Sequence, residues 1–353
     1  MKVLFENVAI RGMATAVPSE CLDLFSLGSQ FGEKEVKKLI ASTGINKIRV
    51  APPHVCISDI CEAAARNLFQ ELAIEPASID GVVLVSETPD YLVPPTSFIL
   101  QEKLGLSKDI VAFDINHGCS GFIYGLYQAS MLVSSGGCRR VLLCLGDVAT
   151  RRVHPQDKAV RMMFGDSGSA LLVERGAGSL RFHLMSDGMS HRALVIPAGG
   201  AKKPCDATTS LPEAYGKNNV RSEETLHMNG MDVMYFALRE VPPMIEEMLA
   251  DTGWSKEEVG TFALHQANRL ILDQLVHKLK LPKEAVPFGV GEIGNSAPSS
   301  ISTMLCVKHK QLEAEERLEK VVACGFGVGL SWAAVALDLS QTKILDVLEM
   351  PNA

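Results

Sequence analysis

Residues 113–122 read FDINHGCSGF and join an apolar strand to a helix. Gly118 permits a tight turn where the strand ends, and Cys119 then opens a helix that runs on through Ala129. This order places the cysteine sulfur at a helix N-terminus, where unpaired N–H groups and the helix dipole favour the thiolate. The backbone N–H of Cys119 is also available as an oxyanion donor. The stretch therefore predicts a nucleophilic cysteine at a strand-to-helix junction.

Short apolar runs on either side of this stretch extend the same pattern. Residues 81–85, 110–115 and 141–145 are each five or six residues long and are followed by turn residues. Strands that are apolar on both faces belong in a central sheet covered by helices. Residues 58–72 place apolar side chains at helical spacing, with Ser58 or Asp59 as the expected cap. We therefore expect a layered α/β fold.

A second set of similar elements follows Gly176. A helix is expected over residues 229–249, kinked or divided at Pro242-Pro243, and a strand over 261–265 runs into a helix from Asn268. Residues 323–337 read as two closing strands. The repetition suggests an internal duplication into residues 1–176, which carry Cys119, and residues 177–353.

Composition narrows the functional class. The chain has 353 residues, 47% of them hydrophobic and 21% charged, with a net charge of −7. This composition supports a sizeable core, and the mild acidity argues against nucleic-acid binding. The longest uncharged run, residues 321–337, is interrupted by glycines, so two strands explain it better than a membrane span.

The compartment is predicted from the cysteines and from the N-terminus. Nine cysteines occur without a C-x-x-C pair, which favours reduced, mostly buried thiols. Apart from Cys119, we interpret them as small buried core residues. The first residues meet a charge too soon to form the apolar segment of a signal peptide. We therefore expect a cytoplasmic protein with no membrane association.

Two further residues become candidates for the chemistry because of their surroundings. His265 ends an apolar strand and begins the run His-Gln-Ala-Asn over residues 265–268. Asn295 stands in a loop of glycines and small hydroxyl residues, ahead of a helix over 301–310. Alone, a histidine at a strand end is more often structural, and such a loop is typical of an ordinary helix cap. Together with Cys119 they form an ordered Cys, His, Asn set.

This set and the segments around it resemble the β-ketoacyl-acyl-carrier-protein synthase III family of the thiolase-like superfamily. The resemblance extends along nearly the whole chain. Besides the three candidate residues, it rests on Thr43-Gly44-Ile45, Thr88-Pro89-Asp90-Tyr91, residues 164–170 (FGDSGSA) and residues 326–332 (FGVGLSW). The resemblance implies a duplicated α-β-α-β-α fold with mixed sheets covered by helices.

The reaction that the resemblance implies is a decarboxylative Claisen condensation. Cys119 takes the acyl group of an acyl-coenzyme A, and a malonyl thioester on acyl carrier protein loses carbon dioxide and attacks it, giving a 3-oxoacyl product. His265 and Asn295 would hydrogen-bond the enolate oxygen, and the N–H groups of Cys119 and Gly329 would form the oxyanion hole. No metal or redox cofactor is implied, since the coenzyme A thioester is a substrate.

The resemblance also suggests binding residues. Arg151 stands where the family often has a phosphate-binding arginine, and Asn268 and Arg269 would lie in the region that binds coenzyme A or the carrier protein. Arg269 follows Asn268 directly, where the family usually has an apolar residue first. Val93 replaces the phenylalanine that blocks the acyl pocket in many fatty-acid initiators, which implies a chain longer than acetyl. Glu87 lies in the same pocket stretch, where small hydroxyl residues are common. A homodimer whose interface completes the pocket is expected.

Three alternatives stay open at this point. The chain could be a related thiolase-like condensing enzyme that joins other acyl thioesters, including two fatty acyl chains. It could be the non-catalytic partner subunit of such an enzyme, although the Cys, His and Asn are all present. A papain-like hydrolase shares the Cys, His, Asn order, but the C-G-x-C-W context is missing.

Overall fold

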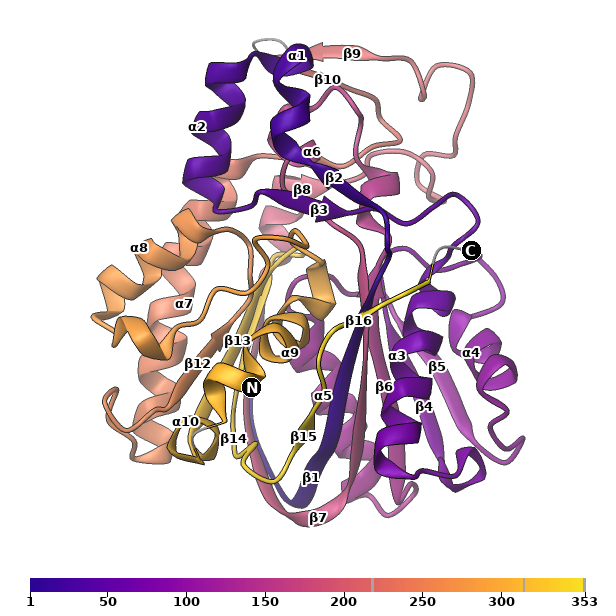
Figure 1. Ribbon diagram of the computed structural model, residues 1–353, viewed down its shortest axis with the longest axis vertical. Helices are drawn as coiled ribbons and strands as arrows, with labels where there is room; N and C mark the ends of the chain where they lie inside the picture. The colour runs from indigo at the N-terminus through magenta and orange to yellow at the C-terminus, as the bar shows by residue number, and fades with distance from the viewer. Residues whose placement is uncertain (217–218, 314, 352–353) are drawn as a thin grey trace.

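A single ten-stranded mixed sheet runs through the molecule, a computed structural model that describes residues 1–216, 219–313 and 315–351 (Figure 1). The strands of this sheet are β1 (Lys2–Val17), β4 (Gly81–Val85), β5 (Val111–Ile115), β6 (Arg140–Asp147), β7 (Ser167–Ser186), β12 (Thr261–Leu264), β13 (Val321–Gly327), β14 (Ser331–Leu337), β15 (Lys343–Ile344) and β16 (Leu348–Glu349). Their order is β12-β13-β14-β7-β6-β4-β5, and β1 pairs with β7, β15 and β16.

Helices cover this sheet, and three small two-stranded sheets lie beside it. The helices are α1 (Gly28–Phe31), α2 (Glu33–Thr43), α3 (Ile57–Leu72), α4 (Thr96–Leu104), α5 (Gly121–Ser134), α6 (Lys158–Arg161), α7 (Gly230–Thr252), α8 (Arg269–Leu279), α9 (Ser300–Leu312) and α10 (Glu315–Glu319). The small sheets pair β2 (Cys21–Asp23) with β3 (Lys47–Arg49), β8 (Leu194–Val195) with β11 (His227–Met228), and β9 (Glu213–Tyr215) with β10 (Asn219–Arg221).

The alternation of side chains along each strand creates the layers. Val83 and Val85 of β4 pack into a central core with α5 and α9, whereas Val82 and Leu84 pack outward against α3 and α4. On the other half of the sheet, residues of β12, β13 and β14 divide in the same way between the central core and an outer core with α7 and α8. Figure 1 shows α3 and α4 on one side of the molecule and α7 and α8 on the other. The predicted α-β-α-β-α layering is confirmed.

The two long strands β1 and β7 join the halves of the sheet. They pair antiparallel along their length, with register shifts between Glu6 and Val8 and between Ile10 and Gly12. One end of β7 pairs with β6 and the other with β14. The boundary predicted after Gly176 therefore falls inside a continuous strand, and the division into two duplicated halves stays a prediction.

Two local expectations change: the helix expected to be kinked or divided at Pro242-Pro243 is not divided, and the cap expected at Ser58 or Asp59 lies elsewhere. Helix α7 runs unbroken through Pro242 and Pro243. Pro242 cannot donate to the Leu238 carbonyl one turn earlier, but the Lys278 ammonium group of α8 donates to that carbonyl at 2.8 Å. Helix α3 is capped at Cys56 instead of Ser58 or Asp59, because the Asp59 carboxylate accepts the Cys56 N–H at 2.6 Å in a capping box.

The uncharged run at residues 321–337 forms strands β13 and β14, as predicted. Across the residues that the structure describes, no helix is both long enough and apolar enough to cross a bilayer.

Candidate active site

The carboxyl ends of three neighbouring parallel strands meet at one cavity. Strand β4 pairs in parallel with both β5 and β6. Glu87 follows β4, Cys119 follows β5, and Asp147 is the last residue of β6. All three line a cavity of about 300 Å³. Ligands commonly bind at this edge of α/β sheets because loops that follow adjacent strands converge there.

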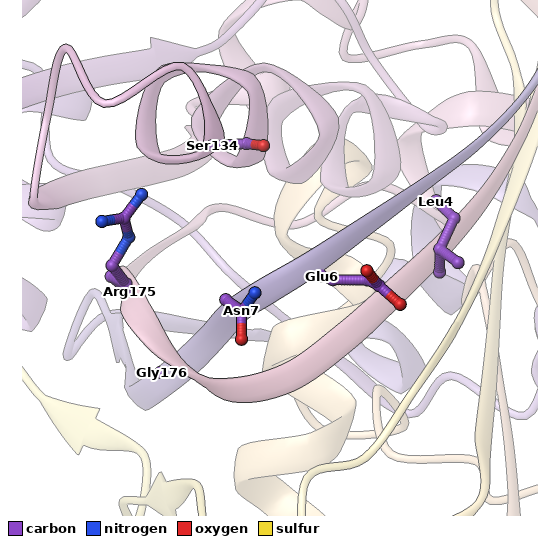
Figure 2. A pocket seen from close by; sticks show the side chains of 6 residues that line it. All are labelled: Leu4, Glu6, Asn7, Ser134, Arg175 and Gly176. Carbon is purple, nitrogen blue, oxygen red and sulfur yellow. The ribbon is translucent and has the colours of Figure 1, made fainter.

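A larger hollow, of about 790 Å³, lies at the opposite end of α5 (Figure 2). Helix α5 begins directly after Cys119 and Ser120, and its last residue, Ser134, lines this second cavity together with residues of β1 and β7. Its other labelled side chains are Leu4, Glu6, Asn7 and Arg175 (Figure 2). None of these is a cysteine or histidine, so the smaller cavity is the candidate for nucleophilic chemistry.

Close backbone packing fixes the position of the Cys119 thiol. The residue is only 6% exposed and stands just ahead of α5. A Cβ on Gly327 of β13 would lie 2.5 Å from the Cys119 Cβ and 2.7 Å from its Sγ. A Cβ on Gly325 would lie 2.7 Å from the Cα of Ser120. The glycines of the C-terminal strand are therefore needed for β13 to pass directly beside the cysteine.

Burial of the thiol opposes the thiolate that the helix N-terminus was expected to favour. Burial, with the charge of Glu87 as the second cause, raises the pKa of Cys119 to about 12. Hydrogen bonds from the backbone N–H groups of Val328 and Cys119 itself act in the opposite direction but do not prevail. Desolvation therefore outweighs the effect of the helix terminus.

Backbone N–H groups nonetheless converge on the sulfur. The sequence predicts the N–H groups of Cys119 and Gly329 as the oxyanion hole, whereas the groups that bond the sulfur belong to Cys119 and Val328. Gly327 packs against the sulfur, so the next N–H along the chain, that of Val328, is directed at it. These contacts to the sulfur favour Val328, and the role of Gly329 in the oxyanion hole stays a prediction.

His265 lies directly after β12 and is 1% exposed. The Ser300 hydroxyl lies 2.6 Å from its Nδ1 and also accepts the Gln266 N–H at 3.4 Å. Ser300 therefore engages Nδ1, and Nε2 is the ring nitrogen with no hydrogen-bond partner among the described residues. Burial lowers the pKa of His265 to about 3, so the ring is neutral and can donate one hydrogen bond without carrying charge.

Asn295 is held behind the cavity by its own backbone. Its N–H donates to the Met163 carbonyl at 2.8 Å, and its carbonyl accepts the Gly165 N–H at 3.1 Å. The side-chain oxygen accepts the Ala297 N–H at 3.0 Å, which leaves the amide NH₂ group to donate elsewhere. Phe164, the strand partner of Asn295, and Ala297 both line the cavity.

The three predicted residues stand in different relations to this cavity, since Cys119 is among its lining residues and His265 and Asn295 are not. Cys119 lines the cavity, and Asn295 borders its wall through Phe164 and Ala297. The His265 ring packs edge-on to Phe326 at 5.5 Å between ring centres, and Phe326 precedes the glycine that touches the sulfur.

A polar cluster beside Cys119 is absent from the sequence-based prediction. Nε2 of His117 lies 2.6 Å from the Ser120 hydroxyl and 3.2 Å from the Ser331 hydroxyl, and the two hydroxyls lie 2.7 Å apart. Ser331 also donates to the Val328 carbonyl at 2.8 Å. The cluster joins residues more than 200 positions apart, so the sequence does not predict it. The only local indication is that His117 lies two residues before Cys119.

Asp147 is a second residue that the sequence-based prediction does not include. One of its carboxylate oxygens, Oδ1, accepts four hydrogen bonds from the loop after β4, namely from the Ser86 hydroxyl, the Glu87 N–H, and the N–H and hydroxyl of Thr88, at 2.7–3.0 Å. Burial raises the pKa of Asp147 to about 7 despite these bonds. The carboxylate therefore anchors the segment that carries Glu87.

Comparison with known proteins identifies the family. The model of 3-oxoacyl-[acyl-carrier-protein] synthase III matches residues 113–188, and that of the C-terminal part of the same family matches residues 249–339. A beta-ketoacyl-[acyl-carrier-protein] synthase III of Gloeobacter violaceus is 32% identical over 93% of this chain and 97% of its own. The chain belongs to the 3-oxoacyl-[acyl-carrier-protein] synthase III family.

Solved structures agree with this assignment. A 3-oxoacyl-(acyl-carrier protein) synthase from Burkholderia xenovorans LB400 superposes with a TM-score of 0.90 at 32% identity, covering 99% of each chain. A second 3-oxoacyl-(acyl-carrier-protein) synthase III gives a TM-score of 0.88 at 35% identity, over 94% of this chain and 99% of the other. The predicted family, thiolase-like fold and acyltransferase class are confirmed.

The binding residues predicted from the synthase III motifs are occupied in local contacts. The Arg151 guanidinium donates to the carbonyls of Pro52 and Pro53, at 2.6 Å and 3.1 Å, and also to that of Val55. The next residue, Arg152, lines the cavity instead. The role of Arg151 in phosphate binding stays a prediction.

Asn268 and Arg269 lie at the start of α8. The Asn268 side chain caps the helix by accepting the Ile271 N–H at 2.9 Å. Arg269 is exposed, with its guanidinium 4.3 Å from the centre of the Phe288 ring. These contacts give Asn268 a structural role and leave Arg269 at the surface, where its role toward the carrier protein stays a prediction.

Val93 and Glu87, which were expected to share an acyl pocket, lie in different surroundings. Glu87 lines the Cys119 cavity, whereas Val93 is 81% exposed and is not among the residues that line it. Within the described residues, no group of three or more His, Cys, Asp or Glu side chains is placed to hold a metal ion.

Proposed function

We propose that this protein transfers an acyl group from an acyl-coenzyme A to Cys119 and condenses it with a malonyl thioester on acyl carrier protein to give a 3-oxoacyl product. The observation that carries the proposal is the Cys119 thiol, which opens onto a cavity while two backbone N–H groups bond its sulfur. Such donors stabilise the tetrahedral intermediate of acyl transfer when they are aimed at the developing oxyanion. The thiol and the oxyanion hole thus form one site.

The oxyanion donors in this proposal are the N–H groups of Cys119 and Val328. Both already bond the sulfur, and the carbonyl carbon of an acyl-cysteine is attached to that sulfur. The Ser331 hydroxyl donates to the Val328 carbonyl and so fixes the Val328–Gly329 peptide, which directly follows the Val328 N–H. Loss of one oxyanion donor typically costs on the order of 10²–10³ in rate.

His265 and Asn295 serve the second half of the reaction. Decarboxylation of a malonyl thioester places negative charge on the thioester oxygen, and neutral donors in a dry site stabilise that charge strongly. The Nε2–H of His265 and the NH₂ of Asn295 are donors without a competing partner among the contacts described above. The low pKa of His265 supports its role as a hydrogen-bond donor instead of a proton donor.

The test is intact-mass spectrometry after incubation with a panel of acyl-coenzyme A thioesters. We expect an adduct of one acyl group on the wild type and on Cys205→Ala, which removes an exposed thiol, and none on Cys119→Ala. Subsequent addition of malonyl-acyl carrier protein should remove the adduct and release a 3-oxoacyl product. Absence of an adduct with every thioester would overturn the proposal and favour a non-catalytic partner subunit.

A homodimer is the second part of the proposal. Strand β5 ends the sheet order, so its outer edge is open to another strand. Tyr91, Leu92 and Val93 nearby are 63%, 88% and 81% exposed, and isolated chains rarely display such an apolar group without a partner. Light scattering should give twice the chain mass, and Leu92→Asp should shift it toward the monomer, whereas Met189→Asp, at an equally exposed site, should not.

The acyl-chain preference follows from the dimer. If Val93 enters the partner's cavity, its small side chain leaves room for a chain longer than acetyl. We expect octanoyl-coenzyme A to acylate the wild type at least as fast as acetyl-coenzyme A, and Val93→Phe to reverse this order. Much faster acetyl transfer in the wild type would contradict the hypothesis. The cytoplasmic location expected from the cysteines stays a prediction; all nine are free thiols.

The main alternative is a related enzyme that joins other acyl thioesters. It shares the acyl-enzyme step and differs in the second substrate. The same experiment separates the two, because release of the adduct by a plain acyl-coenzyme A, and not by malonyl-acyl carrier protein, would favour the alternative.

A further inference from the structure

The carboxyl group of Glu87 occupies a position in the cavity that the mechanism above does not use. It comes from the loop after β4, which lies next to β5 and therefore next to Cys119. A Cβ on Gly118 would lie 2.2 Å from Glu87 Oε2, so the carboxyl group packs directly against the residue before the nucleophile.

The position of Glu87 is firmly held. Its N–H donates to Asp147 Oδ1 at 2.7 Å, and the residues on both sides of it bond the same oxygen. Its own carboxyl group has no hydrogen-bond or salt-bridge partner among the residues that the structure describes. A firmly placed carboxyl group that has no structural partner and lines the same cavity as the nucleophile is free to take up and release a proton.

Among the described residues, the other bases near the nucleophile are neutral or held by hydrogen bonds; Asp147, which lines the same cavity, uses Oδ1 to hold the loop after β4. His265 is neutral with its Nδ1 engaged by Ser300, and Nε2 of His117 is engaged by Ser120 and Ser331. The groups that bond the Cys119 sulfur are backbone N–H donors, which cannot take a proton. Yet acyl transfer from a thioester moves one proton from the attacking thiol to the departing thiol.

We propose that Glu87 is a catalytic residue that carries this proton. Its carboxylate takes the proton from Cys119 Sγ as the sulfur–carbon bond to the acyl carbonyl forms. The bond from that carbon to the coenzyme A sulfur then breaks, and the Glu87 carboxylic acid gives its proton to the departing sulfur. The products are acyl-Cys119 and free coenzyme A, and Glu87 returns to its starting state. This inference rests on the acyl-enzyme step of the proposed function.

The electrostatics of the cavity suit this role. The ionisable groups that face Glu87 are Asp147 from β6, the Cys119 thiol, and Arg152 at the cavity wall. Burial, with the charge of Asp147 second, raises the pKa of Glu87 to about 8, close to the value at which a group exchanges protons most effectively near neutral pH. Because the base form must be present, the acylation rate should rise with pH and level off above about 8.

The test is the single-turnover rate of acyl-Cys119 formation, followed by intact mass between pH 6 and 9.5. Glu87→Gln keeps the shape and removes the proton transfer, so we expect its rate at pH 7 to fall about 100-fold or more and the rise near pH 8 to disappear. Glu87→Asp keeps the carboxyl group and should retain the pH profile at a reduced rate.

If Glu87 took no part in proton transfer, the Glu87→Gln substitution would change the acylation rate in the opposite direction. The Glu87 charge raises the pKa of Cys119, so removing a mere bystander would leave more thiolate and speed acylation. An unchanged or faster rate in Glu87→Gln would overturn the proposal. If Glu87→Gln does not fold, judged by circular dichroism, the same comparison applies to Glu87→Thr. Failure of the wild type to acylate at all would instead refute the proposed function.

Discussion

The strand-to-helix junctions at Cys119 and at His265 share one local design but differ in how their polar groups are used. At the second junction, Asn268 caps α8 and Ser300 engages Nδ1 of the His265 ring, so the imidazole is held in one orientation. At the first junction, Ser120 makes no side-chain cap for α5, and its hydroxyl instead bonds His117 and Ser331. The backbone N–H groups there face the sulfur.

This difference indicates that the two junctions serve different steps of the reaction. The first junction supplies a nucleophile and oxyanion donors, which serve acylation, and the second supplies a neutral donor, which serves condensation. If the division is real, variants at the two junctions should affect different half-reactions.

The largest expected effect separates the two half-reactions directly. Cys119→Ala should abolish acyl-enzyme formation and lower overall turnover by about 10⁴-fold or more. His265→Ala should leave the acylation rate within about threefold of the wild type and lower condensation by about 10²–10³-fold. Intact mass reports the first step and product formation the second. A His265→Ala enzyme that cannot be acylated would contradict the division.

The close passage of β13 gives the next effect. Gly327→Ala places a methyl group within 2.7 Å of Sγ, so the thiol or the strand must move. We expect acylation to fall about 100-fold and the free energy of unfolding to fall by about 1–3 kcal/mol. Gly188→Ala is the matched control, since nothing lies within 4 Å of its added Cβ. Normal acylation in Gly327→Ala would show that the thiol position tolerates displacement.

Smaller effects should follow from the hydroxyl groups that orient each junction. Ser300→Ala removes the partner of His265 Nδ1, so we expect condensation to fall about 10-fold while acylation is unchanged. Ser331→Ala releases the Val328–Gly329 peptide, which directly follows the Val328 N–H donor, and should instead lower acylation by about 3- to 10-fold. Separate assays of the two half-reactions check this. Equal effects of both variants on both steps would contradict separate roles for the junctions.

The sequence predicts the layered fold well because the strands are apolar on both faces and end in recognisable turns. It also places Cys119 and His265 correctly at strand ends, since the change from apolar to small and polar residues is local. It fails where the outcome depends on distant residues. Lys278 compensates for Pro242, and burial of Cys119 between β13 and Glu87 raises a pKa that the helix terminus alone would lower.

Dependence on distant residues also explains why the sequence-based prediction omits Asp147 and Ser331. Asp147 acts through four bonds to a loop some 60 residues earlier, and Ser331 reaches His117 from the last strands of the sheet. Glu87 stands in the sequence as an acidic residue where small hydroxyl residues are common. The sequence-based prediction includes it as an acyl-pocket residue, and only the adjacency of β4 and β5 places it in the Cys119 cavity, against Gly118.

The smallest expected difference is in how the free energy of unfolding depends on pH through the two buried histidines. Burial lowers the pKa of His117 to about 4 and that of His265 to about 3, from 6.5 in each case. Between these values and 6.5 the unfolded chain binds a proton that the folded chain does not, so each histidine lowers stability as pH falls, by at most about 1.4 kcal/mol per pH unit. The loss begins below 6.5 for both and ends near pH 4 for His117 and near pH 3 for His265.

Urea unfolding of His117→Asn and His265→Asn should therefore show less loss of stability on acidification than the wild type. The two variants should differ from each other only between about pH 4 and 3, by about 1 kcal/mol, with His265→Asn the more resistant. Any variant whose slope matches the wild type would mean that its histidine binds protons equally in the folded and unfolded chains. For His265 that result would remove the neutral donor on which the second junction depends, because a ring that is readily protonated in the folded chain would carry charge during condensation.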